Sequence, residues 1–123
     1  MTEQSTNTAQ RAALVKVLAV NAVLAIALFI AGQLADSSGL MANALDNLSD
    51  ALTYAVSYFA VTRSQRWKAG AAGMTGIMLL ILAIGVLADA WRRYVVGSDP
   101  VGPTMVVMAF VAVALNYWCI RIL

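Results

Sequence analysis

The chain has 123 residues, of which 62% are hydrophobic and only 11% are charged. A soluble domain averages about 45–50% apolar and about 25% charged residues, so this composition excludes an ordinary soluble protein and indicates a membrane protein. The formal charge of +2 is too small to favour a nucleic-acid partner. Because the sequence has no histidine and one cysteine, metal ligands have to come from oxygen donors or from that single thiol.

The chain opens with a polar segment, residues 1–12, which we expect to be a disordered tail. Residues 13–123 form the predicted transmembrane domain. This domain contains four apolar runs, each about 20 residues long and without strict alternation of apolar and polar residues, which predicts an all-α membrane protein with four transmembrane helices. We expect the helices near residues 14–34, 40–61, 69–91 and 104–122.

The basic residues predict the orientation of these spans. An even number of spans places both termini on one side of the membrane. If the termini are cytoplasmic, six basic residues lie inside and two lie outside, in agreement with the positive-inside rule. We therefore expect a multi-pass protein of the cytoplasmic membrane. The inner residues are Arg11, Lys16, Arg63, Arg66, Lys68 and Arg121, and the outer ones are Arg92 and Arg93.

Two aspartates, Asp46 and Asp50, lie inside the second apolar run. A charge near the bilayer centre costs about 2.5–3.5 kcal/mol on insertion scales, so acidic residues in spans are rare and usually functional. A spacing of four residues places both carboxylates on one helical face, where they repel each other unless a cation or protons bind. The pair predicts a site for a divalent cation such as zinc, iron, manganese, cobalt or cadmium.

Further polar residues surround this pair in the sequence. Asn43 and Tyr54 extend the stripe along the second span, Asn47 flanks it, and Asn21 lies in the first span. We expect these four to act as secondary ligands or to support the aspartates through hydrogen bonds. Two carboxylates are only half of the roughly four ligands of tetrahedral zinc. In the structural alternative, the aspartates only cap a helix and form hydrogen bonds between helices.

Three other acidic residues lie near the predicted ends of spans. Asp89 stands one turn before Arg92 and Arg93, and we expect it to form an interfacial ion pair with them. Asp36 and Asp99 are expected to be loop or helix-cap residues. The sequence carries no phosphate-binding loop and no nucleophile motif, so we do not expect an enzyme or any cofactor besides the divalent cation at Asp46 and Asp50.

The segment from Ser37 to Ala51, SSGLMANALDNLSDA, resembles the second-helix signature of cation diffusion facilitator transporters. The resemblance implies that Asp46 and Asp50 are the two ligands of that signature, and that Asn43 takes a position that is often acidic. It also implies a homodimer that exchanges a divalent cation for protons, with zinc as the first candidate for that cation. Family members have six helices and draw two further ligands from the fifth. We therefore expect a fragment resembling the first four helices, with a reduced member as the alternative.

Two other classes of protein compete with this interpretation. Small four-helix multidrug exporters have a similar length, but they use an acidic residue in the first helix, where this chain has only Asn21 and Gln33 in the body of the span. A non-transporting membrane subunit would use the polar stripe to dock a partner helix. Export of a divalent cation remains the leading hypothesis, because it accounts for two neighbouring carboxylates in one span.

Overall fold

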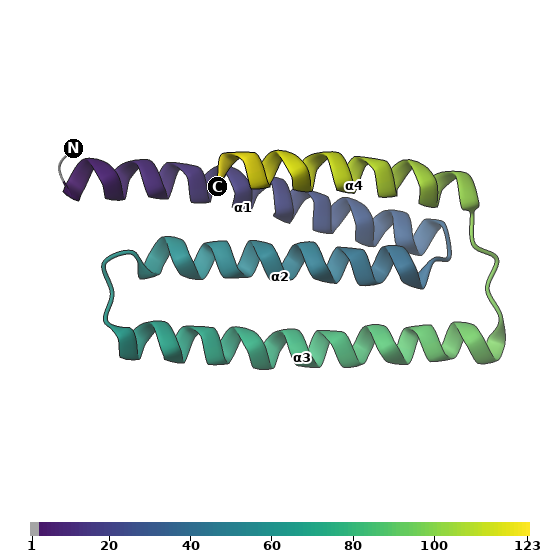
Figure 1. Ribbon diagram of the computed structural model, residues 1–123. Helices are drawn as coiled ribbons and strands as arrows, with labels where there is room; N and C mark the ends of the chain where they lie inside the picture. The colour runs from purple at the N-terminus through teal and green to yellow at the C-terminus, as the bar shows by residue number, and fades with distance from the viewer. Residues whose placement is uncertain (1–2) are drawn as a thin grey trace.

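The computed structural model describes residues 3–123, which form four helices joined by short connections. The helices run side by side along a common direction, with neighbours in sequence antiparallel (Figure 1). This arrangement confirms the predicted all-α fold. The bounds are Glu3–Leu34 for α1, Ser38–Ala60 for α2, Gln65–Val96 for α3 and Gly102–Ile122 for α4.

Two helices extend well beyond the predicted spans. α1 begins at Glu3, so residues 3–12 are helical and our prediction of a disordered tail is wrong for them, while Met1 and Thr2 lie outside the described residues. Extending an existing helix adds one hydrogen bond for each residue that becomes fixed, whereas starting a new helix is the unfavourable step. The guanidinium of Arg11 also lies 5.3 Å from the centre of the Tyr58 ring, which connects this part of α1 to α2.

α3 is longer than its predicted span at both ends. Its 32 residues correspond to about 48 Å, whereas the hydrocarbon core of a bilayer is about 30 Å thick. Ser64 caps its first turn by accepting a hydrogen bond from the backbone N–H of Trp67 at 3.2 Å. Hydropathy therefore located the apolar part of this helix and missed the polar turns that extend it.

α2 lies in the middle of the bundle. It packs along α1 and along α3, while α4 packs mainly on α1 (Figure 1). Within residues 3–123, three helices, α1, α3 and α4, are each long and apolar enough to cross a membrane. α2 has 23 residues, about 35 Å, so its length suffices, but its polar stripe lowers its hydropathy. The chain is thus a multi-pass membrane protein in which α2, the helix that carries the aspartate pair, lies between two helices with long apolar stretches.

α1 and α2 pack closely against each other at Gly32. A Cβ atom at this position would lie 3.0 Å from Cγ and Sδ of Met41 and 3.1 Å from its backbone nitrogen. The absence of a side chain therefore sets the distance between the two helices beside the apolar core. That core contains Leu24, Leu28, Ala35, Leu40, Ala44 and Ala112.

We expect Gly32→Ala to destabilise the bundle. Overpacking costs about 1–3 kcal/mol, which exceeds the gain of about 1 kcal/mol from replacing a helical glycine. Thermal unfolding in detergent micelles, followed by circular dichroism, should show a lower midpoint. Gly85→Ala is the matched control, because no neighbouring atom lies within 4 Å of its added Cβ. Its midpoint should stay equal or rise, and equal losses for both variants would contradict the close-packing explanation.

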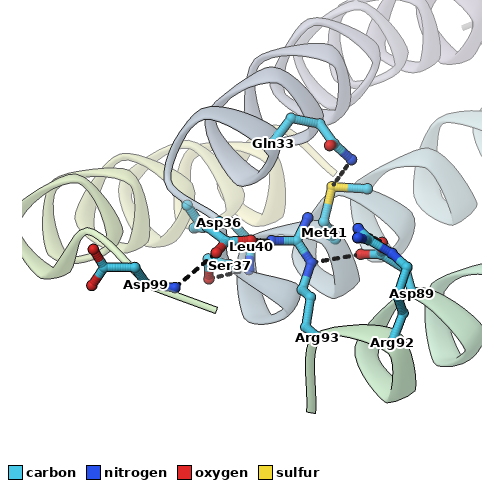
Figure 2. Close-up of polar contacts among 9 residues, drawn as sticks. All are labelled: Gln33, Asp36, Ser37, Leu40, Met41, Asp89, Arg92, Arg93 and Asp99. Atoms are coloured by element: carbon cyan, nitrogen blue, oxygen red, sulfur yellow. Dashed lines mark hydrogen bonds and ion pairs between the residues drawn. The ribbon is translucent and has the colours of Figure 1, made fainter. Parts of the chain in front are cut away.

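Arg93 connects α3 to the α1–α2 turn at one end of the bundle, which we call the turn end because it holds this turn and the α3–α4 connection. Its side chain is 6% exposed and lies between Asp36 and Asp89 (Figure 2). Nε donates to Oδ2 of Asp89 at 2.8 Å, and Nη1 donates to Oδ1 of Asp36. Arg92 donates to the other oxygen of Asp89 at 2.9 Å, which confirms the predicted ion pair.

Asp36 joins the α1–α2 turn to the α3–α4 connection. Its second carboxylate oxygen accepts a hydrogen bond from the backbone N–H of Asp99 at 2.7 Å (Figure 2). Nearby, the backbone N–H of Val101 donates to the carbonyl of Ala35 at 2.9 Å. Asp36 has a φ of +52°, a left-handed conformation that aspartate tolerates better than most residues. The N-cap of α2 is Ser37, so Asp36 is a turn residue and not the cap.

Candidate cation site

The two aspartates of α2 share one broad helical face but differ in exposure. Asp46 is exposed and lies in an open groove of about 480 Å³ between α2 and α3. Asp50 is half-buried one turn further along and lies within electrostatic range of Asp46. The structure therefore brings together the predicted pair, with one carboxylate facing a groove. The other lining residues are Ala42, Leu45, Ser49, Gly76, Leu79, Leu80 and Ala83.

Tyr54 follows Asp50 by one helical turn on α2 and is half-buried. The spacing of four residues places the two side chains on the same helical face, so Tyr54 lies beside the carboxylate that we predicted it would support.

Asn47 is more central than its predicted place beside the polar stripe. Its side chain is 0% exposed, and Nδ2 donates to the backbone carbonyl of Asn43 at 2.9 Å and to Oδ1 of Asn43 at 3.2 Å. Asn43 is half-buried. The Oδ1 atom of Asn47 is buried and has no hydrogen-bond partner among the described residues. A buried acceptor without a partner is unfavourable, so this oxygen is available to a ligand.

Asn21 places a second buried amide between α1 and α4. It is 1% exposed, and its Nδ2 donates to the carbonyl of Val17 at 2.8 Å and to Sγ of Cys119 at 3.5 Å. Its Oδ1 is buried and also lacks a partner within residues 3–123. The side chain therefore does link helices, and it keeps one oxygen free.

The donor set limits what one copy of the described chain can hold. Among residues 3–123, no group of three or more histidine, cysteine, aspartate or glutamate side chains is placed to hold a metal ion. The acidic donors are Asp46 and Asp50, and amide oxygens or water have to supply further ligands. A neighbouring apolar pocket of about 290 Å³, lined from α1, α2 and α3, offers no cation ligand.

Cys119 is the residue near the site that the sequence did not reveal. It lies 98 positions after Asn21, and only the packing of α4 on α1 brings the two side chains together. Spacing within α4 carries a weak signal, because Ala112 and Cys119 stand seven residues apart and are both 3% exposed. Because α4 is apolar on nearly all sides, its sequence does not show which face packs on α1.

Comparison with protein families supplies independent information on the whole transmembrane region. Residues 14–123 match the model of the cation efflux transmembrane domain. Searches of curated proteins and of solved structures gave no match. The family match covers all four apolar runs and includes both aspartates of α2. The chain therefore belongs to the cation efflux family, the cation diffusion facilitators.

Proposed function

We propose that the protein exports a zinc-like divalent transition-metal cation from the cytoplasm in exchange for protons. The observation that supports this most strongly is the carboxylate pair Asp46 and Asp50 on the central helix of a cation efflux domain. The family membership supports cation transport in general. The choice of metal, the coupling to protons and the direction are our inferences from the chemistry of the pair.

Charge balance gives the mechanism. Two carboxylates one helical turn apart repel each other in a poorly solvated place. Either a divalent cation or protons can neutralise the pair, but both cannot do so at once. Metal binding on the cytoplasmic side therefore displaces protons, and protons regained on the other side release the metal. The loaded and empty sites favour different helix arrangements, which couples the exchange to movement.

Four amide and hydroxyl side chains support this pair in our proposal. Asn21 and Asn47 each offer a buried oxygen without a partner within residues 3–123, so we assign these oxygens to a cation that carries Asp50 as a ligand. Asn43 holds Asn47 in place through two hydrogen bonds. Tyr54 lies beside Asp50 and supports it. No enzymatic step is required.

The basic residues support cytoplasmic termini in the cytoplasmic membrane. α1 begins at the same end of the bundle as the α2–α3 connection, and α4 runs toward that end (Figure 1). Six of the eight basic residues belong to segments at this end, whereas Arg92 and Arg93 lie at the turn end. A homodimer, which the family resemblance implies, would allow a second copy to provide further ligands.

Reconstituted proteoliposomes provide the test. We expect an inward zinc gradient to drive proton movement in the opposite direction, reported by a pH-sensitive dye trapped inside. Empty liposomes are the control. Transport of a cationic dye without zinc-driven proton movement would instead indicate a multidrug exporter. Absence of both activities, together with a co-purifying membrane protein, would indicate a non-transporting subunit and contradict the proposal.

A further inference from the structure

Residues 63–68, where α2 connects to α3, carry a high density of positive charge, and we call them the basic segment. They include Arg63, Arg66 and Lys68, together with Trp67. Arg63, Arg66 and Trp67 are exposed, and Lys68 is half-buried. Within residues 3–123, the ion pairs belong to other arginines, at the turn end. The three cations of the basic segment therefore have no anionic partner in the described part of the chain.

The start of α3 adds to this uncompensated charge. The first turn of a helix carries a partial positive charge from its unpaired backbone N–H groups, so anions stabilise it and cations do not. The first turn of α3 contains no acidic residue. Ser64 accepts the N–H of Trp67 but supplies no charge. Arg66 and Lys68 thus have the same sign as the helix end, and an anion from outside the chain would stabilise this arrangement.

The length of α3 shows which anions the basic segment meets. Residues 69–88 carry no charged side chain, and these 20 residues rise about 30 Å, the thickness of the hydrocarbon core. The basic segment directly precedes them, so it lies at the depth of the lipid headgroups, where tryptophan is enriched. The guanidinium of Arg63 lies 5.6 Å from the centre of the Trp67 ring, which orients one cation in this layer. The anions at this depth are headgroup phosphates.

The opposite end of α3 has similar residues but a different charge balance. Trp91 precedes Arg92 and Arg93, and both arginines form ion pairs with Asp89. Arg93 also pairs with Asp36 (Figure 2). The cations of the turn end are therefore balanced within the chain. The basic segment, by contrast, keeps its charge for an external anion.

We propose that the basic segment is a binding site for anionic phospholipids. Arg63, Arg66 and Lys68 contact the headgroup phosphate, and Trp67 lies against the upper part of the acyl chains. Clustered basic residues beside a membrane-spanning helix attract anionic lipids, and the planar guanidinium binds phosphate through two parallel hydrogen bonds. The proposal does not involve the transported cation, so it can fail without affecting the proposed function, and the reverse also holds.

Tryptophan fluorescence in liposomes tests this proposal. The chain has three tryptophans, so the double variant Trp91→Phe, Trp118→Phe keeps Trp67 as its single reporter. The liposomes contain phosphatidylcholine and equal fractions of either brominated phosphatidylglycerol or brominated phosphatidylcholine, because bromine quenches a neighbouring tryptophan. We expect stronger quenching by the anionic lipid, equivalent to at least about threefold tighter association. Both leaflets contain the brominated lipid, so the direction of insertion does not affect the result.

The other end of α3 provides the matched reporter. The double variant Trp67→Phe, Trp118→Phe keeps Trp91, which lies beside arginines that are already paired. We expect equal quenching of Trp91 by the two brominated lipids. A preference for phosphatidylglycerol as large as that at Trp67 would mean that anionic lipid surrounds the protein without a specific site, and it would overturn the proposal.

Substitutions in the Trp67 reporter protein identify the groups that bind. Arg63→Gln, Arg66→Gln, Lys68→Gln removes the charge from side chains outside the core and should abolish the preference. Arg63→Lys, Arg66→Lys keeps the charge and should retain most of it. Equal quenching by the two lipids in the reporter protein itself, or a preference that survives the glutamine variant, would overturn the proposal.

A change of buffer separates lipid phosphate from free phosphate. Replacing sodium chloride by sodium phosphate at equal ionic strength should leave the preference for phosphatidylglycerol unchanged, because electrostatic screening is then the same. Loss of the preference in phosphate would show that the basic segment binds the free anion, and it would overturn the assignment to lipid.

Discussion

Zinc uptake by inverted membrane vesicles is expected to fall by more than about tenfold when Asp50 is replaced by asparagine, a loss of more than about 1.4 kcal/mol. The substitution keeps the shape of the side chain and removes one of the two charges that attract the cation. Asp50 is the half-buried member of the pair, so water replaces it less readily than it replaces the exposed Asp46. We therefore expect a smaller loss for Asp46→Asn.

Asp99→Asn is the matched control for that measurement. Asp99 is exposed in the α3–α4 connection, and its contact with Asp36 uses its backbone N–H, which the substitution retains. Uptake should remain within about twofold of the wild type. If Asp50→Asn and Asp99→Asn retain equal uptake at equal protein levels, the carboxylate pair does not bind the transported cation.

Arg93→Ala is expected to cause the largest loss of stability, about 2–4 kcal/mol. The guanidinium is buried and is shared by Asp36 and Asp89, so its removal leaves Asp36 without its cation and leaves Asp89 with only the exposed Arg92. It also separates α3 from the α1–α2 turn. The expected loss of unfolding free energy is smaller than the largest losses known for buried ion pairs. The side chain of Asp36 is 40% exposed, so water can partly replace its partner.

Arg92→Ala provides the comparison for Arg93→Ala. The side chain of Arg92 is 63% exposed, and it shares Asp89 with Arg93. Exposed ion pairs contribute about 0–1 kcal/mol, so its unfolding midpoint in detergent should change little. Circular dichroism during heating distinguishes the two variants. Equal shifts would mean that the connection at the turn end does not depend on the buried position of Arg93.

The helices could be predicted because lipid imposes a strong rule on sequence. Backbone groups have to be paired inside the membrane, so each apolar run of about 20 residues indicates one helix. The same rule does not apply outside the hydrocarbon region. For this reason the prediction from hydropathy missed the first turns of α1 and the ends of α3. In those places Ser64 caps the start of α3, and the contact between Arg11 and Tyr58 connects the added turns of α1 to α2.

The site was predictable where it depends on one helix and unpredictable where it depends on packing. Helical spacing alone places Asp46 and Asp50 on one face. The full burial of Asn47 reflects how α2 is rotated against α1, and the contact between Asn21 and Cys119 reflects the position of α4. The contact of Asp36 with Arg93 likewise joins residues 57 positions apart. Periodicity within a single helix contains no information about such pairs.

Equilibrium binding of radioactive zinc to the purified chain tests the central claim most directly, because it requires neither a proton gradient nor a known direction of transport. The wild type should bind zinc saturably. The double variant Asp46→Asn, Asp50→Asn should bind at least about a hundredfold more weakly, a loss of about 2.8 kcal/mol. Its helix content should match that of the wild type. Zinc binding of unchanged affinity by the folded double variant would contradict the account.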